Sequence, residues 1–114
     1  MDCIFCKIIA GEIPCAKVFE DETVLCFKDI QPSAPIHYLI IPKMHISAAS
    51  EITSENSAVV ARIFEVAAEI ARNEGISDYR VITNCGEDAC QSVFHLHFHF
   101  VAGTKLGWGK DFAR

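Results

Sequence analysis

Three histidines, His95, His97 and His99, alternate with bulky apolar residues near the C-terminus of this 114-residue chain. Strict alternation predicts a β-strand over residues 93–101, with the three imidazoles on one face and the apolar side chains on the other. A strand rises about 3.3 Å per residue, so neighbouring imidazoles would start about 6.6 Å apart. Such a row could be a solvated polar face. Placing three imidazoles against a core costs free energy, which is expected only where the rings have a function. The spacing therefore indicates a functional site.

Metal binding is one chemistry that suits this row of histidines. A His-x-His pair can chelate one zinc ion, as in some hydrolytic metal sites. Three histidines that span about 13 Å do not all reach one ion unaided, so a metal-dependent hydrolase would need other ligands and would leave a histidine over.

A second group of reactive side chains lies at the N-terminus, where Cys3 and Cys6 form a Cys-x-x-Cys pair. This spacing suits zinc binding, thiol redox chemistry or a free buried dithiol. No thioredoxin-like βαβ pattern surrounds it, which disfavours the redox role. The remaining cysteines are scattered, and with no export signal we expect them to be small buried hydrophobes in a reducing compartment. They are Cys15, Cys26, Cys85 and Cys90.

The elements that must position these residues follow an α+β order. We expect a short helical turn, a hairpin around Asp21 and Glu22, a strand that Pro42 ends, a long amphipathic helix and two final strands. Thr53 or Ser54 can cap the long helix and Gly75 can end it. The expected ranges are 4–10, 16–20, 23–28, 37–41, 54–74, 79–84 and 93–101.

Composition limits the class of protein. A chain of this length predicts one domain over residues 1–114. The hydrophobic fraction of 51% is high for so small a unit, and we read the excess as a covered surface in a homodimer. The net charge is -5 and no basic run is present, which disfavours a nucleic acid polymer as partner. No apolar stretch could span a membrane and the N-terminus is unlike a signal peptide, so we expect a cytoplasmic protein.

The histidine row resembles the signature of the histidine triad (HIT) family, in which His-x-His-x-His is followed by two apolar residues. Further segments resemble the same family in the same order: IFCKIIAGEIP, VFEDE, FKDIQPSAPIHYLIIPKMHI and RVITNCGEDACQSVFH. The chain is most similar to the Hint-type nucleoside phosphoramidases and their bacterial relatives. The resemblance implies an α+β, HIT-like fold with a five-stranded antiparallel sheet, one long and one short helix, and a sheet that continues across a homodimer.

The resemblance also implies catalytic roles. His97 would be the nucleophile that forms a nucleotidyl-histidine, which water then hydrolyses. A proton on its Nδ1, donated to a backbone carbonyl, would leave Nε2 free to attack. His99 would stand beside the same phosphate, His37 would support the nucleophile from behind, and Ser92 would contact the phosphate or the leaving group.

The nucleoside site follows in the same way. Asp29 matches the carboxylate that accepts both ribose hydroxyls, and four apolar residues match the slot around the base, although sequence alone favours plain core packing for these four. The full nucleotide-binding set that the resemblance implies is Phe5, Ile8, Phe27, Asp29, Ile30, Asn84, Gln91, Ser92, His97 and His99. Two departures stand out: Ala89 and Cys90 replace a glycine pair, and Gly109-Lys110 follows Trp108 where the family has Pro-Pro.

For the metal, His45 and His95 are the best candidates to complete a zinc site with Cys3 and Cys6. Such a site resembles that of CxxC-bearing bacterial members and of related nucleotidylyltransferases. A closed Cys₂His₂ shell leaves no position for water, so the zinc would be structural. We expect no organic cofactor.

The sequence thus predicts a purine nucleotide-binding hydrolase or transferase that acts on an adenosine phosphoramidate or a related nucleotide conjugate. Its partners would be nucleoside monophosphates, their conjugates and a second copy of the chain. The alternatives are a non-catalytic nucleotide sensor or scaffold and a dinucleotide polyphosphate hydrolase.

Overall fold

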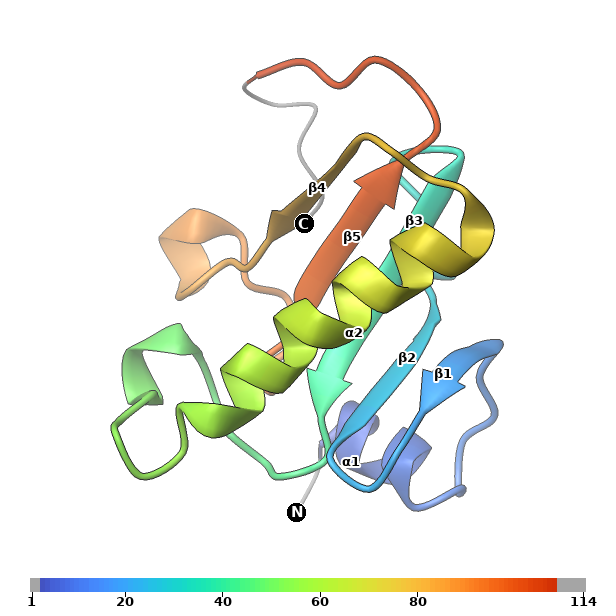
Figure 1. Ribbon diagram of the computed structural model, residues 1–114. Coiled ribbons are helices and arrows are strands. Elements are labelled where there is room, and N and C mark those ends of the chain that lie inside the picture. Colours follow the sequence, from blue (N-terminus) through green and yellow to red (C-terminus); the bar gives the residue numbers. More distant parts are fainter. Residues whose placement is uncertain (1–2, 109–114) are drawn as a thin grey trace.

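The computed structural model describes residues 3–108, and every structural statement below refers to that part of the chain. It contains two helices, five strands and two short 3₁₀ turns at Ala49–Glu51 and Glu87–Ala89 (Figure 1). In chain order the helices and strands are α1 (Ile4–Ile9), β1 (Lys17–Glu20), β2 (Val24–Lys28), β3 (Ile36–Pro42), α2 (Ala58–Glu74), β4 (Tyr79–Ile82) and β5 (Phe98–Ala102). Among these residues, no helix combines the length and apolar character needed to cross a bilayer.

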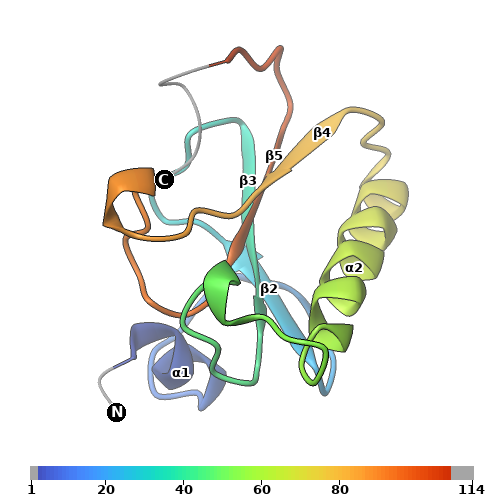
Figure 2. The same cartoon turned by 90° about the vertical axis from the view of Figure 1, so that its left-hand side faces the viewer.

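The strands form one antiparallel sheet in the order β1-β2-β3-β5-β4, so β1 and β4 are its edges. Helix α2 covers one face, and α1 lies on the other side (Figure 2). Alternate residues serve the two faces. On β2, Val24 and Cys26 join the core under α2, whereas Leu25 and Phe27 pack with Phe5 of α1. The predicted α+β class, the five-stranded antiparallel sheet and the long and short helix are confirmed, and the continuation of the sheet across a dimer stays a prediction.

Helix α2 buries the apolar stripe that its periodicity predicts, including Ile63, Val66 and Ile70. It ends at Gly75, whose φ of 68° is the left-handed conformation that glycine adopts without strain. The predicted start at residue 54 is wrong, because α2 begins at Ala58. Residues 54–57 form a separate turn, in which the Thr53 hydroxyl accepts a hydrogen bond from the Glu55 amide at 3.2 Å.

The strand predicted over residues 93–101 is also shorter, because β5 begins only at Phe98. Phe98 pairs with Ile40, so the same register would next place His97 opposite Ile41 and then Leu96 opposite Pro42. Proline has no amide hydrogen to donate, and the Pro42 carbonyl instead accepts a hydrogen bond from the His95 ring at 2.8 Å. The backbone at Leu96 turns to the carbonyl of Ile46. His95 and His97 therefore precede the strand, and His99 lies within it.

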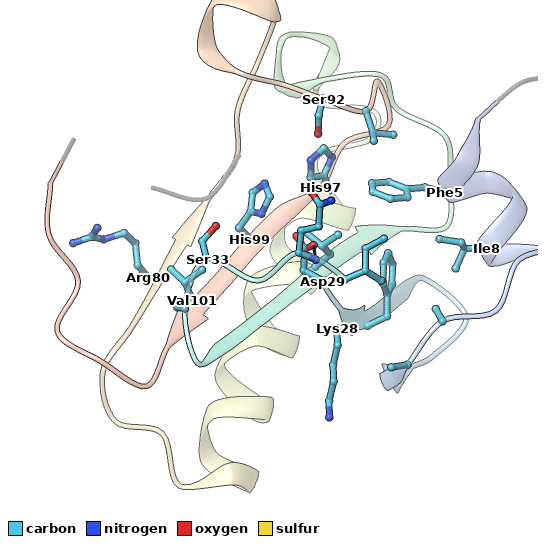
Figure 3. Close-up of a pocket in the computed structure, with 18 of the residues that line it drawn as sticks. Phe5, Ile8, Lys28, Asp29, Ser33, Arg80, Ser92, His97, His99 and Val101 are labelled. Atoms are coloured by element: carbon cyan, nitrogen blue, oxygen red, sulfur yellow. Dashed lines mark hydrogen bonds between the residues drawn. The ribbon is translucent and has the colours of Figure 1, made fainter. Parts of the chain in front are cut away.

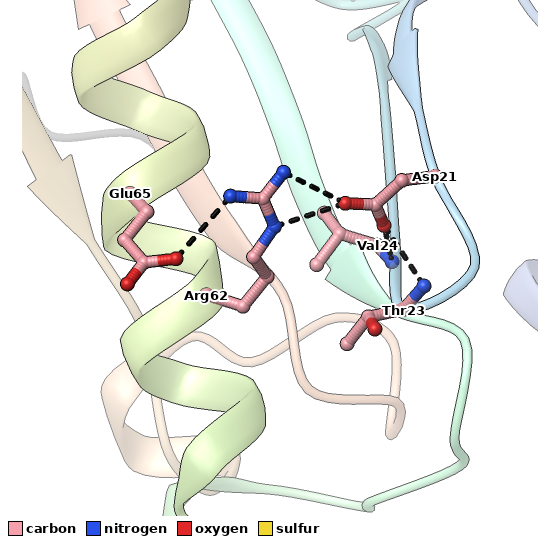
Figure 4. A network of polar contacts seen from close by, with 5 residues as sticks. All are labelled: Asp21, Thr23, Val24, Arg62 and Glu65. Carbon is pink, nitrogen blue, oxygen red and sulfur yellow. Dashed lines mark hydrogen bonds and ion pairs between the residues drawn. The ribbon is translucent and has the colours of Figure 1, made fainter.

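A polar network fixes the hairpin between β1 and β2 to α2 (Figure 4). The Asp21 carboxylate accepts the amides of Thr23 and Val24 at 2.8 Å each and the guanidinium of Arg62 at 2.9 Å. Burial alone would raise the pKa of Asp21, but the two amides and Arg62 hold it below its ordinary value. Arg62 also contacts Glu65 at 3.2 Å. These contacts attach α2 to the hairpin of the sheet. The histidines lie on the opposite face of the sheet.

Candidate active site and metal centre

The face opposite α2 carries a cleft of about 1030 Å³. Its walls come from α1, from the segment between β2 and β3, from strand β5 and from residues 104–107. Most of the predicted nucleotide-binding residues line it, namely Phe5, Ile8, Phe27, Asp29, Ile30, Ser92, His97 and His99. Phe5 and Ile8 form one side, Arg80 and Val101 lie at the other, and the two histidines stand between them (Figure 3). The cleft thus has an apolar end and a polar end joined at the imidazoles.

The ring of His97 is held in one tautomer. Its Nδ1 lies 2.7 Å from the backbone oxygen of His95. A carbonyl oxygen only accepts hydrogen bonds, so Nδ1 carries the proton and Nε2 keeps a lone pair. Burial lowers the pKa of His97, while this hydrogen bond and the charge of Asp29 act in the opposite direction. The neutral ring with an unprotonated Nε2 is the form that nucleophilic attack needs.

His99 is oriented by a chain of hydrogen bonds that begins at a backbone amide. The amide of Ser33 donates to Nδ1 of His37 at 2.8 Å, so the proton of that ring is on Nε2. Nε2 of His37 lies 2.9 Å from Nδ1 of His99, which must therefore accept. The proton of His99 is then on its own Nε2. Two histidines and one amide form a relay whose last hydrogen bond donor is His99 Nε2–H.

That donor is buried and has no hydrogen-bond partner among the described residues. Burial, His97 and His37 lower the pKa of His99 to about 3, so its ring is neutral at pH 7. A buried donor without a partner costs about 1–3 kcal/mol. Since His99 lines the cleft, an acceptor oxygen on a bound ligand would satisfy it. The pair His97 and His99 thus offers a nucleophile and a hydrogen bond donor side by side, with ring centres 5.1 Å apart.

Asp29 lies beside this pair. One carboxylate oxygen is 3.3 Å from Nε2 of His37, and the other accepts the Gln31 amide at 2.8 Å. The side chain is 14% exposed and lines the cleft. Its position between the apolar wall and the histidines agrees with the expected contact to a ribose, which stays a prediction.

Two expected nucleotide contacts, Asn84 and Gln91, are not among the residues that line the cleft. Gln91 is buried, and its amide group donates to the carbonyls of Ser47 and Val93 and accepts from the amide of Gly86. It supports the loop that precedes Ser92. In the same loop Cys90 has a φ of 68°, a conformation in which the family's glycine carries no steric penalty.

Sequence reasoning missed the backbone groups of Ser33 and Pro42, because any residue type supplies an amide or a carbonyl. It also missed Arg80, which lines the cleft, donates to the carbonyl of Gly107 at 2.6 Å and lies 5.0 Å from the Trp108 ring centre. The residues after Trp108, where the tail departs from the family, lie outside the described part of the chain.

The predicted zinc ligands come together beside α1. Cys3, Cys6, His45 and His95 present donor atoms that all lie within 4.8 Å of one another. Nδ1 of His95 is 3.3 Å from Sγ of Cys3, 3.5 Å from Sγ of Cys6 and 3.1 Å from Nδ1 of His45. Tetrahedral zinc with these ligand types requires donor separations of about 3.3–3.8 Å. The residues fit the ion.

The surroundings of these ligands also suit a metal. Nε2 of His95 donates to the Pro42 carbonyl, so Nδ1 keeps its lone pair and faces the thiols. The amide of Cys6 donates to Sγ of Cys3 at 3.2 Å. Burial and the neighbouring Cys3 raise the pKa of Cys6 to about 11, which a bound cation would offset.

A second cluster, Asp29, His37 and His99, also has donor atoms close together. It does not fit a metal in the same way. The Ser33 amide occupies Nδ1 of His37, so the nitrogen that faces Asp29 and His99 carries a proton.

Comparison with known proteins agrees with this geometry. The model of a family described as scavenger mRNA decapping enzyme, C-terminal binding, matches residues 2–110. A histidine triad protein from Clostridium difficile has a TM-score of 0.92 and 46% identity, covering 96% of this chain and 97% of its own. A Zea mays protein named 14 kDa zinc-binding protein is 43% identical, covering 92% of this chain and 84% of its own. An Arabidopsis thaliana protein named adenylylsulfatase HINT1 is 39% identical, covering 92% and 74%.

The proton assignments predict a specific ¹⁵N spectrum of the histidine rings in the unliganded protein. At pH 7, His97 should be the Nδ1–H tautomer, and His37 and His99 should be Nε2–H tautomers. Because the pKa of His99 is lowered to about 3, its ring should stay neutral well below the ordinary value of about 6.5. Ser33→Ala keeps the backbone amide and should leave the spectrum unchanged. A cationic His99 at pH 6 would contradict the relay.

Proposed function

The chain belongs to the histidine triad family of nucleotide-binding hydrolases, and from that premise we propose that it transfers a nucleoside 5′-phosphoryl group to His97 and then to water. The observation that carries the proposal is the hydrogen bond from His97 Nδ1 to the His95 carbonyl, because it leaves the Nε2 lone pair for the attack. The proposed substrates are an adenosine phosphoramidate or a related nucleotide conjugate. The name of the Arabidopsis relative, an adenylylsulfatase, supports an adenylate conjugate.

In the first step His97 Nε2 forms a bond to phosphorus and the bond from phosphorus to the leaving group breaks. The ring then carries a positive charge, which the His95 carbonyl and Asp29 stabilise. His99 Nε2–H donates to a phosphate oxygen. The Ser92 hydroxyl, on the same cleft, donates a hydrogen bond to the leaving atom, which takes the electron pair of the broken bond and a proton from solvent.

In the second step water attacks the same phosphorus atom. The bond to Nε2 breaks, the electron pair returns to the ring, and the water passes a proton to solvent, which replaces the proton that the leaving group took in the first step. A nucleoside monophosphate leaves and His97 is again neutral. Asp29 holds the ribose and the wall of Phe5, Ile8 and Phe27 holds the base throughout.

The metal-dependent alternative, with the triad as catalytic ligands of one ion, has less support. The ring of His95 faces the two cysteines and His45. Among the described residues, His97 belongs to no group that could hold an ion. We propose instead that Cys3, Cys6, His45 and His95 bind one structural zinc ion, as the name of the Zea mays relative also suggests. A cytoplasmic location stays a prediction.

His97→Ala should abolish turnover of an adenosine phosphoramidate and largely preserve binding of adenosine 5′-monophosphate (AMP). Covalent catalysis needs the imidazole, whereas Asp29 and the apolar wall hold the nucleoside independently. We expect a loss of several orders of magnitude in kcat, with the AMP dissociation constant measured by calorimetry as the control. Residual activity within about tenfold of wild type, which is about 1.4 kcal/mol, would contradict the assignment.

Purified, reduced protein should carry about one zinc ion per chain by elemental analysis. Stripping it should lower the melting temperature more than the rate at saturating substrate, because the ion would organise the fold and not activate water. The Cys3→Ser/Cys6→Ser variant should match the stripped protein, and Cys85→Ser, at an exposed cysteine, should match wild type. An unchelated preparation without zinc would exclude the four-ligand site and leave the triad mechanism intact.

We also propose a two-fold dimer in which α2 and the edge strand β4 meet their copies and the sheet continues across the axis. Phe64 on α2 and Tyr79 on β4 are 50% and 39% exposed, which a partner would cover. Light scattering at micromolar concentration should give twice the chain mass of 12.6 kDa. Phe64→Glu should weaken the dimer, and Glu65→Gln, at a neighbouring polar position, should not. A wild-type mass of one chain would rule the dimer out.

A further inference from the structure

Helix α1, together with its N-cap Cys3, contributes residues to both candidate sites. Cys3 caps its N-terminus and Cys6 lies within it, and both belong to the metal-binding group. Phe5 and Ile8, on the same short helix, line the cleft where the nucleoside is proposed to bind. Phe5 stands between the two cysteines in the sequence, so its backbone cannot move without moving at least one metal ligand.

The ring of Phe5 contacts the proposed nucleophile His97 and the metal-binding residue His95. Its centre lies 5.2 Å from that of His97, 5.9 Å from that of His95 and 5.7 Å from that of Phe27, each in an edge-to-face arrangement. Only 7% of the residue is exposed. The position of Phe5 therefore sets the width of the apolar end of the cleft.

Two kinds of contact hold Phe5 in that place, namely apolar packing and the metal-binding group. A helix of this length is far below the roughly 12 residues at which an isolated helix becomes marginally stable. Apolar packing of Cys3 and Phe5 on β2 and β3 contributes. The polar tether is the cluster itself, which joins α1 to His45, after β3, and to His95, before β5.

The nucleophile, by contrast, has anchors that do not involve the cysteines. The His95 ring donates to the Pro42 carbonyl at 2.8 Å, and the amide of Leu96 donates to the Ile46 carbonyl at 2.6 Å. These two bonds fix the backbone that carries the His95 carbonyl, the acceptor of the His97 proton. The nucleophile is thus anchored through the backbone of His95 by bonds that do not depend on the two cysteines.

We infer that a metal ion at Cys3, Cys6, His45 and His95 controls how tightly the cleft binds the nucleoside, through the position of Phe5, and leaves the chemical step nearly unchanged. This inference rests on the proposed function, because it concerns the same cleft. Linkage makes the effect reciprocal: the nucleotide must tighten metal binding by the same factor by which the metal tightens nucleotide binding.

The test compares AMP binding by calorimetry in the zinc-loaded and the chelator-stripped protein, at a temperature where far-ultraviolet circular dichroism shows that both are folded. The expected result is a dissociation constant at least tenfold higher without zinc, with kcat for an adenosine phosphoramidate changed less than threefold. Zinc affinity, measured by competition with a chromophoric chelator, should rise by the same factor when AMP is present.

Two variants locate the coupling. Phe5→Leu keeps all four metal ligands but shortens the side chain that faces His97, so its AMP affinity should depend little on zinc. Cys85→Ser removes an exposed cysteine outside the cluster and should keep the full effect. Full coupling in Phe5→Leu would overturn the inference, since global folding or another route would then carry it.

If the stripped protein does not fold, the cobalt(II)-substituted protein gives the same information. Saturating AMP should slow the transfer of cobalt to a chelator at least tenfold in wild type and much less in Phe5→Leu; an unchanged rate in wild type would overturn the inference. Equal AMP affinity with and without zinc would also overturn it but leave the proposed function intact. Absence of AMP binding in both forms would instead reject the proposed function.

Discussion

The hydrogen bond from Nδ1 of His97 to the backbone oxygen of His95 is the interaction on which the remaining site depends. It assigns the proton of a buried ring whose pKa is lowered by burial, and it leaves one nitrogen for chemistry. The His95 carbonyl is available as the acceptor because the residues before Phe98 do not pair with β3. In this region Pro42 has a carbonyl, which accepts from the His95 ring, but no amide hydrogen to donate. A continuous ladder through residues 93–97 would have engaged that backbone elsewhere.

His95 is the residue at which the two sites meet. Its Nδ1 faces the cysteines, its Nε2 bonds the Pro42 carbonyl, and its own carbonyl orients His97. The relay from Ser33 through His37 to His99 gives His99 the opposite tautomer to His97, with the proton on Nε2 facing the cleft. One ring is thus a lone-pair donor and the next a hydrogen bond donor. Two neutral histidines that differ only in tautomer can therefore take different roles.

Much of this was accessible from the sequence. Alternating apolar residues and helical periodicity predicted the strands and α2, and the Cys-x-x-Cys pair with two distant histidines predicted the metal-binding group that the structure assembles. The boundaries were less accessible. The strand over 93–101 was predicted too long, because alternation continues through His95 while its pairing partner ends at a proline. The roles of the Ser33 amide and the Pro42 carbonyl could not be predicted from residue type, because both are backbone groups. Gln91 was predicted from the resemblance alone, and the structure shows it bound to backbone groups.

The central claim is that His97 forms a covalent bond to phosphorus, and trapping that adduct tests it most directly. Rapid acid-free quenching during turnover of an adenosine phosphoramidate, followed by proteolysis and fragment mass spectrometry, should place an adenylyl group on the ring of His97. The adduct should be absent from the His97→Ala protein and should decay on a time scale that matches turnover. An adduct on another residue, or turnover at full rate with no adduct at any time, would contradict the account.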